Sequence, residues 1–191
     1  MQRTSNYKIV YCKKIQLVCE DLIREFAISE IEKKIDPLAP IPDQIQIRHI
    51  LPYDLKNIIN SELSSYNIPP IRYCLSYVRS KYSTQGIHVD GDQSEIIKSA
   101  INIPLKGCKD SYQIWYKGDY NTVIVRTSNN VYHNIVWQKP FTEDFRLEIM
   151  QPYLLRVDKP HSVVANRVED RWVFTMRFYG NPDFAKLAAN V

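Results

Sequence analysis

Hydrophobic and polar residues follow two different periods along the chain, and the change of period divides it into two parts. Between positions 13 and 34 apolar residues recur at roughly helical spacing among charged ones, which predicts an amphipathic helix. The apolar positions are Ile15, Val18, Leu22, Phe26 and Ile31. Segment 44–51 alternates as a strand does, and segment 52–63 begins with Pro52 and returns to helical spacing. Residues 1–68 are therefore predicted to form a mostly helical support.

From residue 69 the pattern changes to short aromatic or β-branched runs bounded by Gly, Pro, Asn or Asp. These runs are 72–80, 99–105, 111–116, 121–127, 129–137, 152–158 and 171–179. So many short strands in succession predict an antiparallel sandwich or barrel. The predicted fold is mainly β with some α: a jelly-roll, cupin-like core over 69–180, buttressed by the N-terminal helices and followed by a tail over 181–191.

Composition places this fold in one domain of 191 residues, with 45% hydrophobic and 24% charged residues. We find no apolar run of membrane-spanning length and no signal-peptide pattern, so neither a membrane nor export is expected. The four cysteines form no C-x-x-C pair and are typical of reduced thiols, which predicts a cytoplasmic protein. A net charge of +4, spread without a basic stripe, does not favour a nucleic-acid partner.

The segment GIHVDGD, residues 86–92, contains the first candidate chemistry. Residues two apart in an extended segment share a face, so His88 and Asp90 point the same way, and Gly91 lets the chain turn after them. A histidine and a carboxylate from one strand end, with a second histidine from elsewhere, form the facial triad that holds Fe(II) and leaves coordination positions open. The alternative is a solvated pair or a hydrogen-bonded turn, because an isolated H-x-D motif arises often by chance.

A third ligand must come from the remaining histidines. His49 lies outside the predicted barrel, and His133 lies near a turn without a charged companion. His161 ends one predicted strand and precedes another that carries arginines, so we predict that His88, Asp90 and His161 bind the metal. We expect Asp90 to serve the metal and not the packing of the domain.

The strand RWVFTMRF, residues 171–178, carries arginines on one face and aromatic residues on the other. If both faces are buried, Arg171 and Arg177 need an anionic partner inside the protein. The alternative is an arginine face exposed to solvent. In the functional interpretation Arg171, ten residues after His161, binds a ligand carboxylate through two hydrogen bonds.

The order H-x-D, distal histidine and arginine ten residues later resembles the Fe(II)- and 2-oxoglutarate-dependent oxygenases, over roughly residues 70–180. Their core is a double-stranded β-helix. The resemblance implies that His88, Asp90 and His161 are the iron ligands and that Arg171 binds the far carboxylate of 2-oxoglutarate.

Three further residues are assigned through the same resemblance. Tyr77 matches a position where many members supply a tyrosine hydroxyl to the cosubstrate, and Asn102 lies where members often have a polar group, unless it is an edge amide. Arg171 and Arg177 form an R-x5-R pattern similar to the branch that demethylates alkylated nucleobases. Because the two arginines could bring their head groups near opposite ends of a small diacid, Arg177 is also a candidate for binding the cosubstrate. That branch's Asn-x-Tyr motif is missing, however, and the spacing of ten is closer to the prolyl- and aspartyl-hydroxylase branches.

The activity implied is hydroxylation of a C–H bond in a small molecule or side chain, using O2 and 2-oxoglutarate and releasing succinate and CO2. Trp115 and Tyr116 are candidate walls of the site. One alternative is a cupin-like metal-binding isomerase, which has no use for a carboxylate-binding Arg171. A second is a β-sandwich binding module with an accidental H-x-D motif, and a third is an oxygenase that acts on alkylated nucleobases.

Overall fold

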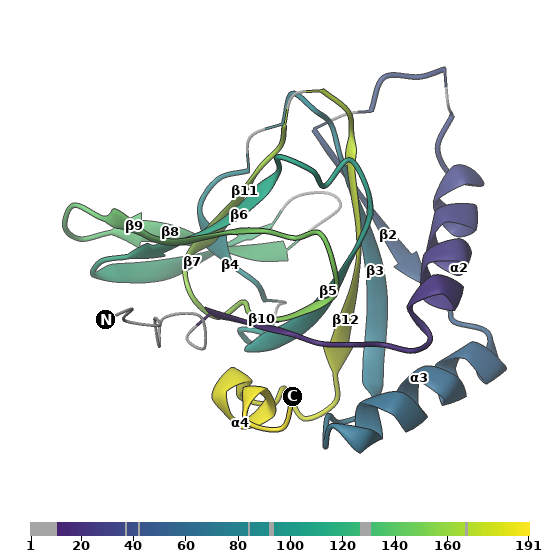
Figure 1. Cartoon of the computed structure of the whole chain (residues 1–191). Helices are drawn as coiled ribbons and strands as arrows, with labels where there is room; N and C mark the ends of the chain where they lie inside the picture. Colours follow the sequence, from purple (N-terminus) through teal and green to yellow (C-terminus); the bar gives the residue numbers. More distant parts are fainter. Residues whose placement is uncertain are drawn as a thin grey trace, which may run out of the picture.

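Two antiparallel sheets of six strands each face one another in the computed structural model, with helices against one of them (Figure 1). The structure describes residues 11–36, 38–41, 43–83, 85–91, 94–126, 131–166 and 168–191. In chain order the elements are β1 (Cys12–Lys14), α2 (Glu20–Glu32), β2 (Gln44–His49), α3 (Tyr53–Ser65), β3 (Ile71–Arg79), β4 (His88–Val89), β5 (Ser99–Lys106), β6 (Tyr112–Lys117), β7 (Tyr120–Arg126), β8 (Val131–Trp137), β9 (Thr142–Glu148), β10 (Tyr153–Arg156), β11 (His161–Val164), β12 (Arg171–Phe178) and α4 (Phe184–Ala188).

The first sheet has the strand order β1-β10-β5-β12-β3-β2, and the second has the order β7-β8-β4-β11-β6-β9. Because strands that are distant in sequence lie side by side, the chain crosses between the sheets repeatedly, as in a jelly roll. The predicted mainly β jelly-roll fold is therefore confirmed. No helix in the described part of the chain is long and apolar enough to cross a membrane.

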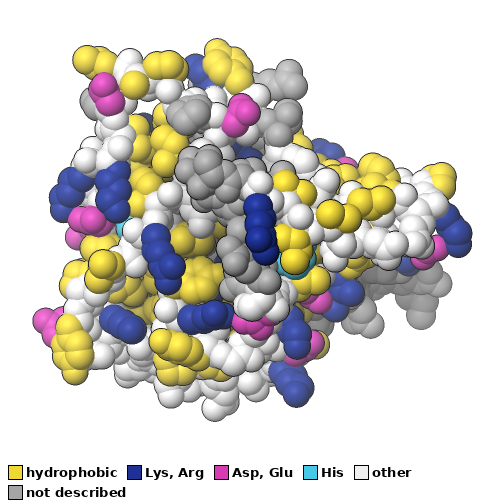
Figure 2. Space-filling model, turned by 180° about the vertical axis from the view of Figure 1, so that it is seen from behind, with side chains coloured by type: hydrophobic (Ala, Val, Ile, Leu, Met, Phe, Trp, Pro, Cys, Tyr) yellow, Lys and Arg dark blue, Asp and Glu magenta, His cyan; other side chains and the backbone are white. Residues whose placement is uncertain are grey.

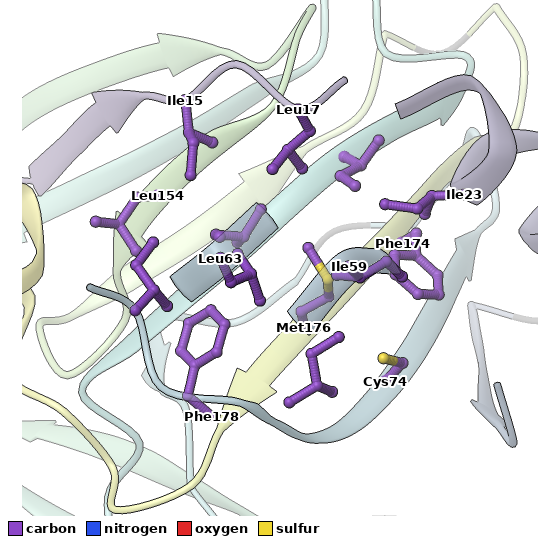
Figure 3. Close-up of a cluster of buried hydrophobic side chains, with 14 of the residues drawn as sticks. Ile15, Leu17, Ile23, Ile59, Leu63, Cys74, Leu154, Phe174, Met176 and Phe178 are labelled. Atoms are coloured by element: carbon purple, nitrogen blue, oxygen red, sulfur yellow. The ribbon is translucent and has the colours of Figure 1, made fainter. Parts of the chain in front are cut away.

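Helices α2 and α3 cover the outer face of the first sheet, and apolar side chains fill the space between (Figure 3). Ile23 of α2 and Ile59 and Leu63 of α3 are fully buried against the aromatic face of β12. Phe174 and Met176 on that face are also fully buried. Because side chains alternate along a strand, the other face of β12 points between the two sheets and carries its arginines there.

The N-terminal part departs from its predicted pattern. The helix expected over 13–34 is shorter, because β1 pairs with β10 and the backbone N–H of Ile15 donates to the carbonyl of Pro152 at 3.2 Å. Ile15 is buried from this extended segment, whereas Val18 and Leu22 are 97% and 49% exposed. The prediction that these two residues lie on the buried face of a helix was wrong. The side chains of α2 that are buried are Ile23, Ala27 and Ile31.

The strand predicted over 44–51 exists as β2, but it forms the edge of the first sheet and so belongs to the barrel. The helix predicted over 52–63 is confirmed as α3, which follows Pro52. Strand β9 has the sequence TEDFRLE and was missed because its exposed edge position allows charged residues in place of an apolar alternation.

Candidate metal centre

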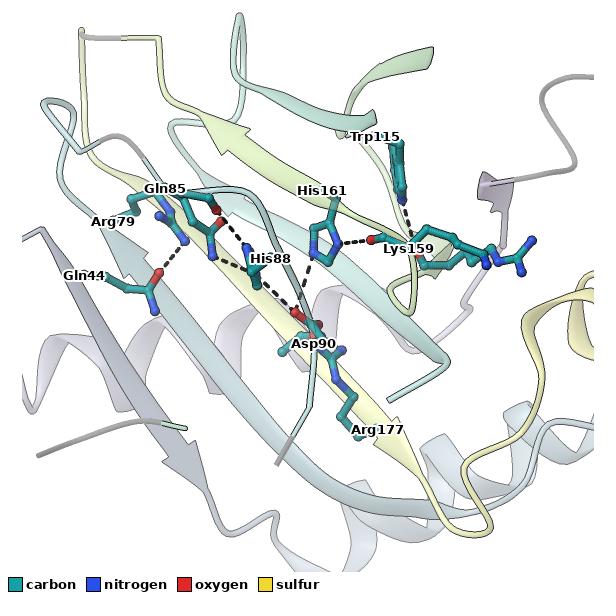
Figure 4. Close-up of polar contacts among 12 residues, drawn as sticks. Gln44, Arg79, Gln85, His88, Asp90, Trp115, Lys159, His161 and Arg177 are labelled. Carbon is teal, nitrogen blue, oxygen red and sulfur yellow. Dashed lines mark hydrogen bonds and ion pairs between the residues drawn. The ribbon is translucent and has the colours of Figure 1, made fainter. Parts of the chain in front are cut away.

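Two neighbouring strands of the second sheet bring the candidate ligands together. His88 of β4 and His161 of β11 lie directly opposite one another in antiparallel register, with ring centroids 4.5 Å apart. Asp90 follows β4, and its backbone is held by hydrogen bonds to the carbonyl of Val157 at 3.0 Å and from the N–H of Ile97 at 2.9 Å. The side chains of His88 and Asp90 thus meet that of His161, which comes from a distant part of the sequence (Figure 4).

The glycine after Asp90 is required by space. A Cβ at Gly91 would lie 2.4 Å from Cδ2 of His133, closer than any real contact. Position 91 therefore favours a glycine, because the buried His133 ring occupies the place of any larger side chain. Residues 92 and 93, which the predicted turn needs, lie outside the described residues.

The possible ligand atoms lie at distances that suit a metal ion. Oδ1 of Asp90 is 3.4 Å from Nε2 of His88 and 3.5 Å from Nε2 of His161, and the three ligand atoms lie within 4.8 Å of one another. Adjacent ligands of an ion with bonds near 2.1 Å are about 3 Å apart. Small side-chain movements would therefore give an ion all three ligands.

Hydrogen bonds of the His88 and His161 rings determine which ring nitrogen faces the possible position of the metal ion. Nδ1 of His88 lies 3.0 Å from the carbonyl of Gly86, and Nδ1 of His161 lies 2.8 Å from the carbonyl of Lys159. A carbonyl only accepts, so each Nδ1 carries the proton and each Nε2 keeps its lone pair. Two nitrogen lone pairs and a carboxylate oxygen then face one another, an arrangement that a cation stabilises.

Electrostatics favour the metal-binding protonation states of Asp90 and His88. Burial opposes ionisation of Asp90, whereas the charge of Arg177 favours it, and the pKa of this carboxyl lies well below its usual range. Burial, and then the neighbouring His161, lower the pKa of His88. A carboxylate and a neutral imidazole are the forms that bind metals.

Arg177 contacts the candidate metal centre directly. The sequence indicated that this arginine, if buried, needs an anionic partner inside the protein, but not that Asp90 is the partner. Its guanidinium donates to Oδ2 of Asp90 and to the hydroxyl of Thr175. Oδ1 of Asp90 therefore faces the two histidines, whereas Oδ2 accepts a hydrogen bond from the buried Arg177. The expectation that Asp90 serves only the metal was wrong, because it also neutralises Arg177 inside the protein.

Every residue of β12 is buried, so the arginine face does not point to solvent. Arg171 is 4% exposed and lies directly opposite Arg79 of β3, which is also 4% exposed. Within the described part of the chain Arg171 has no hydrogen-bond or ion-pair partner, and its buried Nε is unsatisfied. Arg171, the arginine predicted to bind a ligand carboxylate, is thus buried and has N–H groups available to donate to one.

The two further candidates also lie on the inner face of the first sheet. Tyr77 faces Val173 across the strand pair, and burial together with the charge of Asp90 raises the pKa of its phenol. Asn102 faces Thr175 on β12, and its buried Oδ1 has no partner in the described structure. Because β5 lies between β10 and β12, the interpretation of Asn102 as an edge amide was wrong.

The other histidines occupy different environments. His49 lies between the rings of Phe26 and Phe174 on the helix-facing side of the sheet, and its Nε2 is 2.7 Å from Oγ of Ser76. Burial lowers the pKa of His49 to about 4. His133 pairs in register with Val89, one residue from His88, so its side chain points to the opposite face of the second sheet.

Of the two predicted aromatic walls, only Trp115 lies beside the centre. It is fully buried, with its ring 6.4 Å from that of His161. Tyr116 is on the opposite face, where its hydroxyl is 2.9 Å from Oγ of Ser162. Sequence reasoning also missed Gln85, whose side-chain amide donates to Nε2 of His88 at 2.9 Å, because an amide in a loop has no distinguishing pattern.

Comparisons with known proteins add to the description of the fold. No family model matches the sequence, and no curated protein matches it. Among solved structures, HygX from Streptomyces hygroscopicus with nickel and 2-oxoglutarate bound is similar with a TM-score of 0.53 and 10% identity, over 94% of this chain and 88% of that chain.

Two further solved structures have lower scores. A prolyl-4-hydroxylase from Pseudomonas putida has a TM-score of 0.44 and 11% identity, over 88% of this chain and 92% of that chain. The E. coli protein ycfD has a TM-score of 0.44 and 10% identity, over 78% of this chain and 37% of its own length. At such low identity the likeness to HygX concerns the fold alone, and this chain shares with it a jelly-roll core of two antiparallel sheets.

Proposed function

We propose that this protein is an Fe(II)- and 2-oxoglutarate-dependent oxygenase that hydroxylates a C–H bond of a small molecule or side chain. The observation that carries the proposal is the convergence of three lone-pair atoms from His88, Asp90 and His161 on one point. HygX, whose fold this chain shares, was solved with nickel and 2-oxoglutarate bound, which supports the same pairing of metal and cosubstrate here.

The donor set suits Fe(II). Two imidazoles and one carboxylate on one side form the 2-His-1-carboxylate triad, which leaves positions open for a chelating oxo acid and for oxygen. When bound, iron and 2-oxoglutarate together supply the activation of O2, coupled to decarboxylation of the oxo acid to succinate, that hydroxylates a C–H bond. Trp115, fully buried beside His161, helps to exclude water from this chemistry.

The protein's own residues then have separate tasks. The carbonyls of Gly86 and Lys159 keep each Nε2 of the ligand pair unprotonated, and Arg177 holds Asp90 ionised and oriented. Arg171, buried without a partner in the described structure, binds the far carboxylate of the cosubstrate. This last task favours an oxygenase over a cupin-like isomerase.

The R-x5-R pattern does not support action on alkylated nucleobases. Arg177 is engaged by Asp90 and Thr175, so it does not join Arg171 in gripping the two ends of one diacid. We therefore keep hydroxylation of a small molecule or side chain as the proposed reaction.

Calorimetric titration tests the proposal without knowledge of the substrate. The metal-free protein should bind one Mn(II), used as a redox-inert substitute for Fe(II), and only the Mn(II)-loaded protein should then bind 2-oxoglutarate tightly. Tight Mn(II) binding without any 2-oxoglutarate binding would favour the isomerase alternative. Absence of Mn(II) binding would mean that the H-x-D motif is accidental and would favour the binding-module alternative.

A further inference from the structure

A buried pair of arginines lies on the inner face of the first sheet, and the proposed function uses only one of them. Arg79 of β3 and Arg171 of β12 are directly opposite in register, and both side chains are 4% exposed. Directly opposed residues of neighbouring strands have Cβ atoms about 5 Å apart. The two side chains therefore begin next to each other in a region shielded from water, and the charge of Arg171 acts on Arg79.

Neither arginine of this pair forms an ion pair among the contacts that the structure describes. Arg79 donates to the uncharged Oε1 of Gln44, and the buried Nε atoms of both arginines have no partner. Cys108, the neighbour of Arg171, is itself buried and burial raises its pKa, so it remains a neutral thiol. Asp43 and Asp90 act on Arg79 less strongly than Arg171 does.

Both arginines nevertheless keep their charge near neutral pH. Burial, and then the charge of Arg171, lower the pKa of Arg79 to about 10, and burial lowers the pKa of Arg171. Two like charges held together away from water repel each other and lose hydration, which is unfavourable unless an anion meets them. The arrangement is that of a prepared anion site.

This pair also lies near the candidate metal centre. The charge of the candidate ligand Asp90 acts on Arg79. Tyr77, two residues before Arg79 on the same strand face, is within electrostatic reach of both Asp90 and Arg79. An anion held by the arginines would therefore belong to the same interior space as the metal ligands.

We propose that Arg79 and Arg171 together form one buried site for a terminal carboxylate, and that Arg79 determines selectivity for dicarboxylates over monocarboxylates. This inference rests on the proposed function for the identity of its ligand, 2-oxoglutarate. It goes beyond that function because Arg79 becomes a second cosubstrate-binding residue. Removal of either arginine leaves the carboxylate with one buried partner instead of two.

The test compares 2-oxoglutarate with 2-oxobutyrate, which has the same chelating oxo acid end but no second carboxylate. Calorimetry on the Mn(II)-loaded protein should show that Arg79→Gln weakens 2-oxoglutarate binding by at least about tenfold, since buried charge-assisted pairs are strong. Binding of 2-oxobutyrate should stay within about twofold of the wild type. Arg79→Lys, which keeps the charge but not the planar fork, should lie between the wild type and Arg79→Gln.

Arg48→Gln is the matched control, because Arg48 is an exposed arginine on the neighbouring strand β2. It should leave both affinities unchanged. The melting temperature of anion-free Arg79→Gln should not fall below that of the wild type, because a repulsion is removed. An unchanged affinity for 2-oxoglutarate in Arg79→Gln, or an equal loss for both acids, would overturn the proposal.

A separate arm distinguishes failure of this inference from failure of the proposed function. Glutarate, which lacks the oxo group, should stabilise the metal-free wild type against heat at constant ionic strength, and Arg79→Gln should abolish this effect. If Mn(II)-loaded wild type binds neither oxo acid while glutarate still stabilises it through Arg79, the anion site stands and the oxygenase proposal fails. If glutarate stabilises wild type and Arg79→Gln equally, the site is refuted.

Discussion

Replacement of Asp90 by alanine is predicted to destabilise the metal-free protein strongly, contrary to what the sequence led us to expect. The carboxylate is the ion-pair partner of Arg177, and their side chains are 17% and 4% exposed. Removal of one partner of a buried ion pair leaves an uncompensated charge, at a cost of about 3 to 5 kcal/mol. Because solvent reaches Asp90 in part, we expect about 3 kcal/mol.

For a protein of this size, each kcal/mol corresponds to about 2 to 4 °C in melting temperature, so Asp90→Ala should melt about 6 to 12 °C lower. Urea denaturation in the presence of a chelator measures the free energy of unfolding. A double-mutant cycle with Asp90→Asn and Arg177→Met isolates the pair, and the double variant should lose less stability than the sum of the single variants.

The reasoning would be refuted by a metal-free Asp90→Ala protein whose unfolding free energy lies within about 0.5 kcal/mol of the wild type, the range of an ordinary surface substitution. The reasoning would also be contradicted if the losses of unfolding free energy in the two single variants added up to the loss in the double variant. Such additivity would mean that Asp90 and Arg177 do not interact.

Three further predictions concern single residues. His161→Ala should abolish tight Mn(II) binding, whereas His133→Ala should leave it within a few fold, and calorimetric titration reports a wrong ligand choice if the two outcomes are exchanged. Arg171→Gln should weaken 2-oxoglutarate binding to the Mn(II)-loaded protein by roughly thirtyfold or more while Mn(II) affinity stays within a few fold; equal losses of both would mean a general structural defect. The pKa of His49 is about 4 in the folded protein and near 6.5 when unfolded, so its neutral form is favoured by folding. As pH falls from 6.5 to 4 the unfolding free energy should therefore drop by about 2 to 3 kcal/mol through this residue, a loss that urea titrations should find missing in His49→Gln.

The sequence was sufficient for the fold class and for the grouping of the candidate metal ligands. Period-two alternation and turn residues marked most strands, and the H-x-D spacing placed His88 and Asp90 on one face. The choice of His161 depended on exclusion and resemblance, yet the structure pairs it in register with His88. Local pattern succeeds here because strand geometry alone fixes which side chains share a face.

Other features depend on contacts between distant segments, which no local pattern encodes. The shortened α2 reflects pairing of β1 with β10, more than 130 positions later in the chain. The Asp90–Arg177 pair and the Arg79–Arg171 pair each join residues from distant segments of the chain. Apolar side chains are also exposed on the paired strands β7 and β8, where Val123 and Val136 are 51% and 47% exposed (Figure 2). An apolar residue in the sequence therefore did not predict a buried side chain in these strands.

The most direct test of the oxygenase account is the release of succinate from 2-oxoglutarate by the purified protein with Fe(II) and O2, measured across a panel of candidate substrates. The account predicts succinate formation that requires Fe(II), increases with at least one substrate and disappears in His161→Ala. Succinate formation that is equal in wild type and His161→Ala, or absent from the wild type under every condition of the panel, would contradict it.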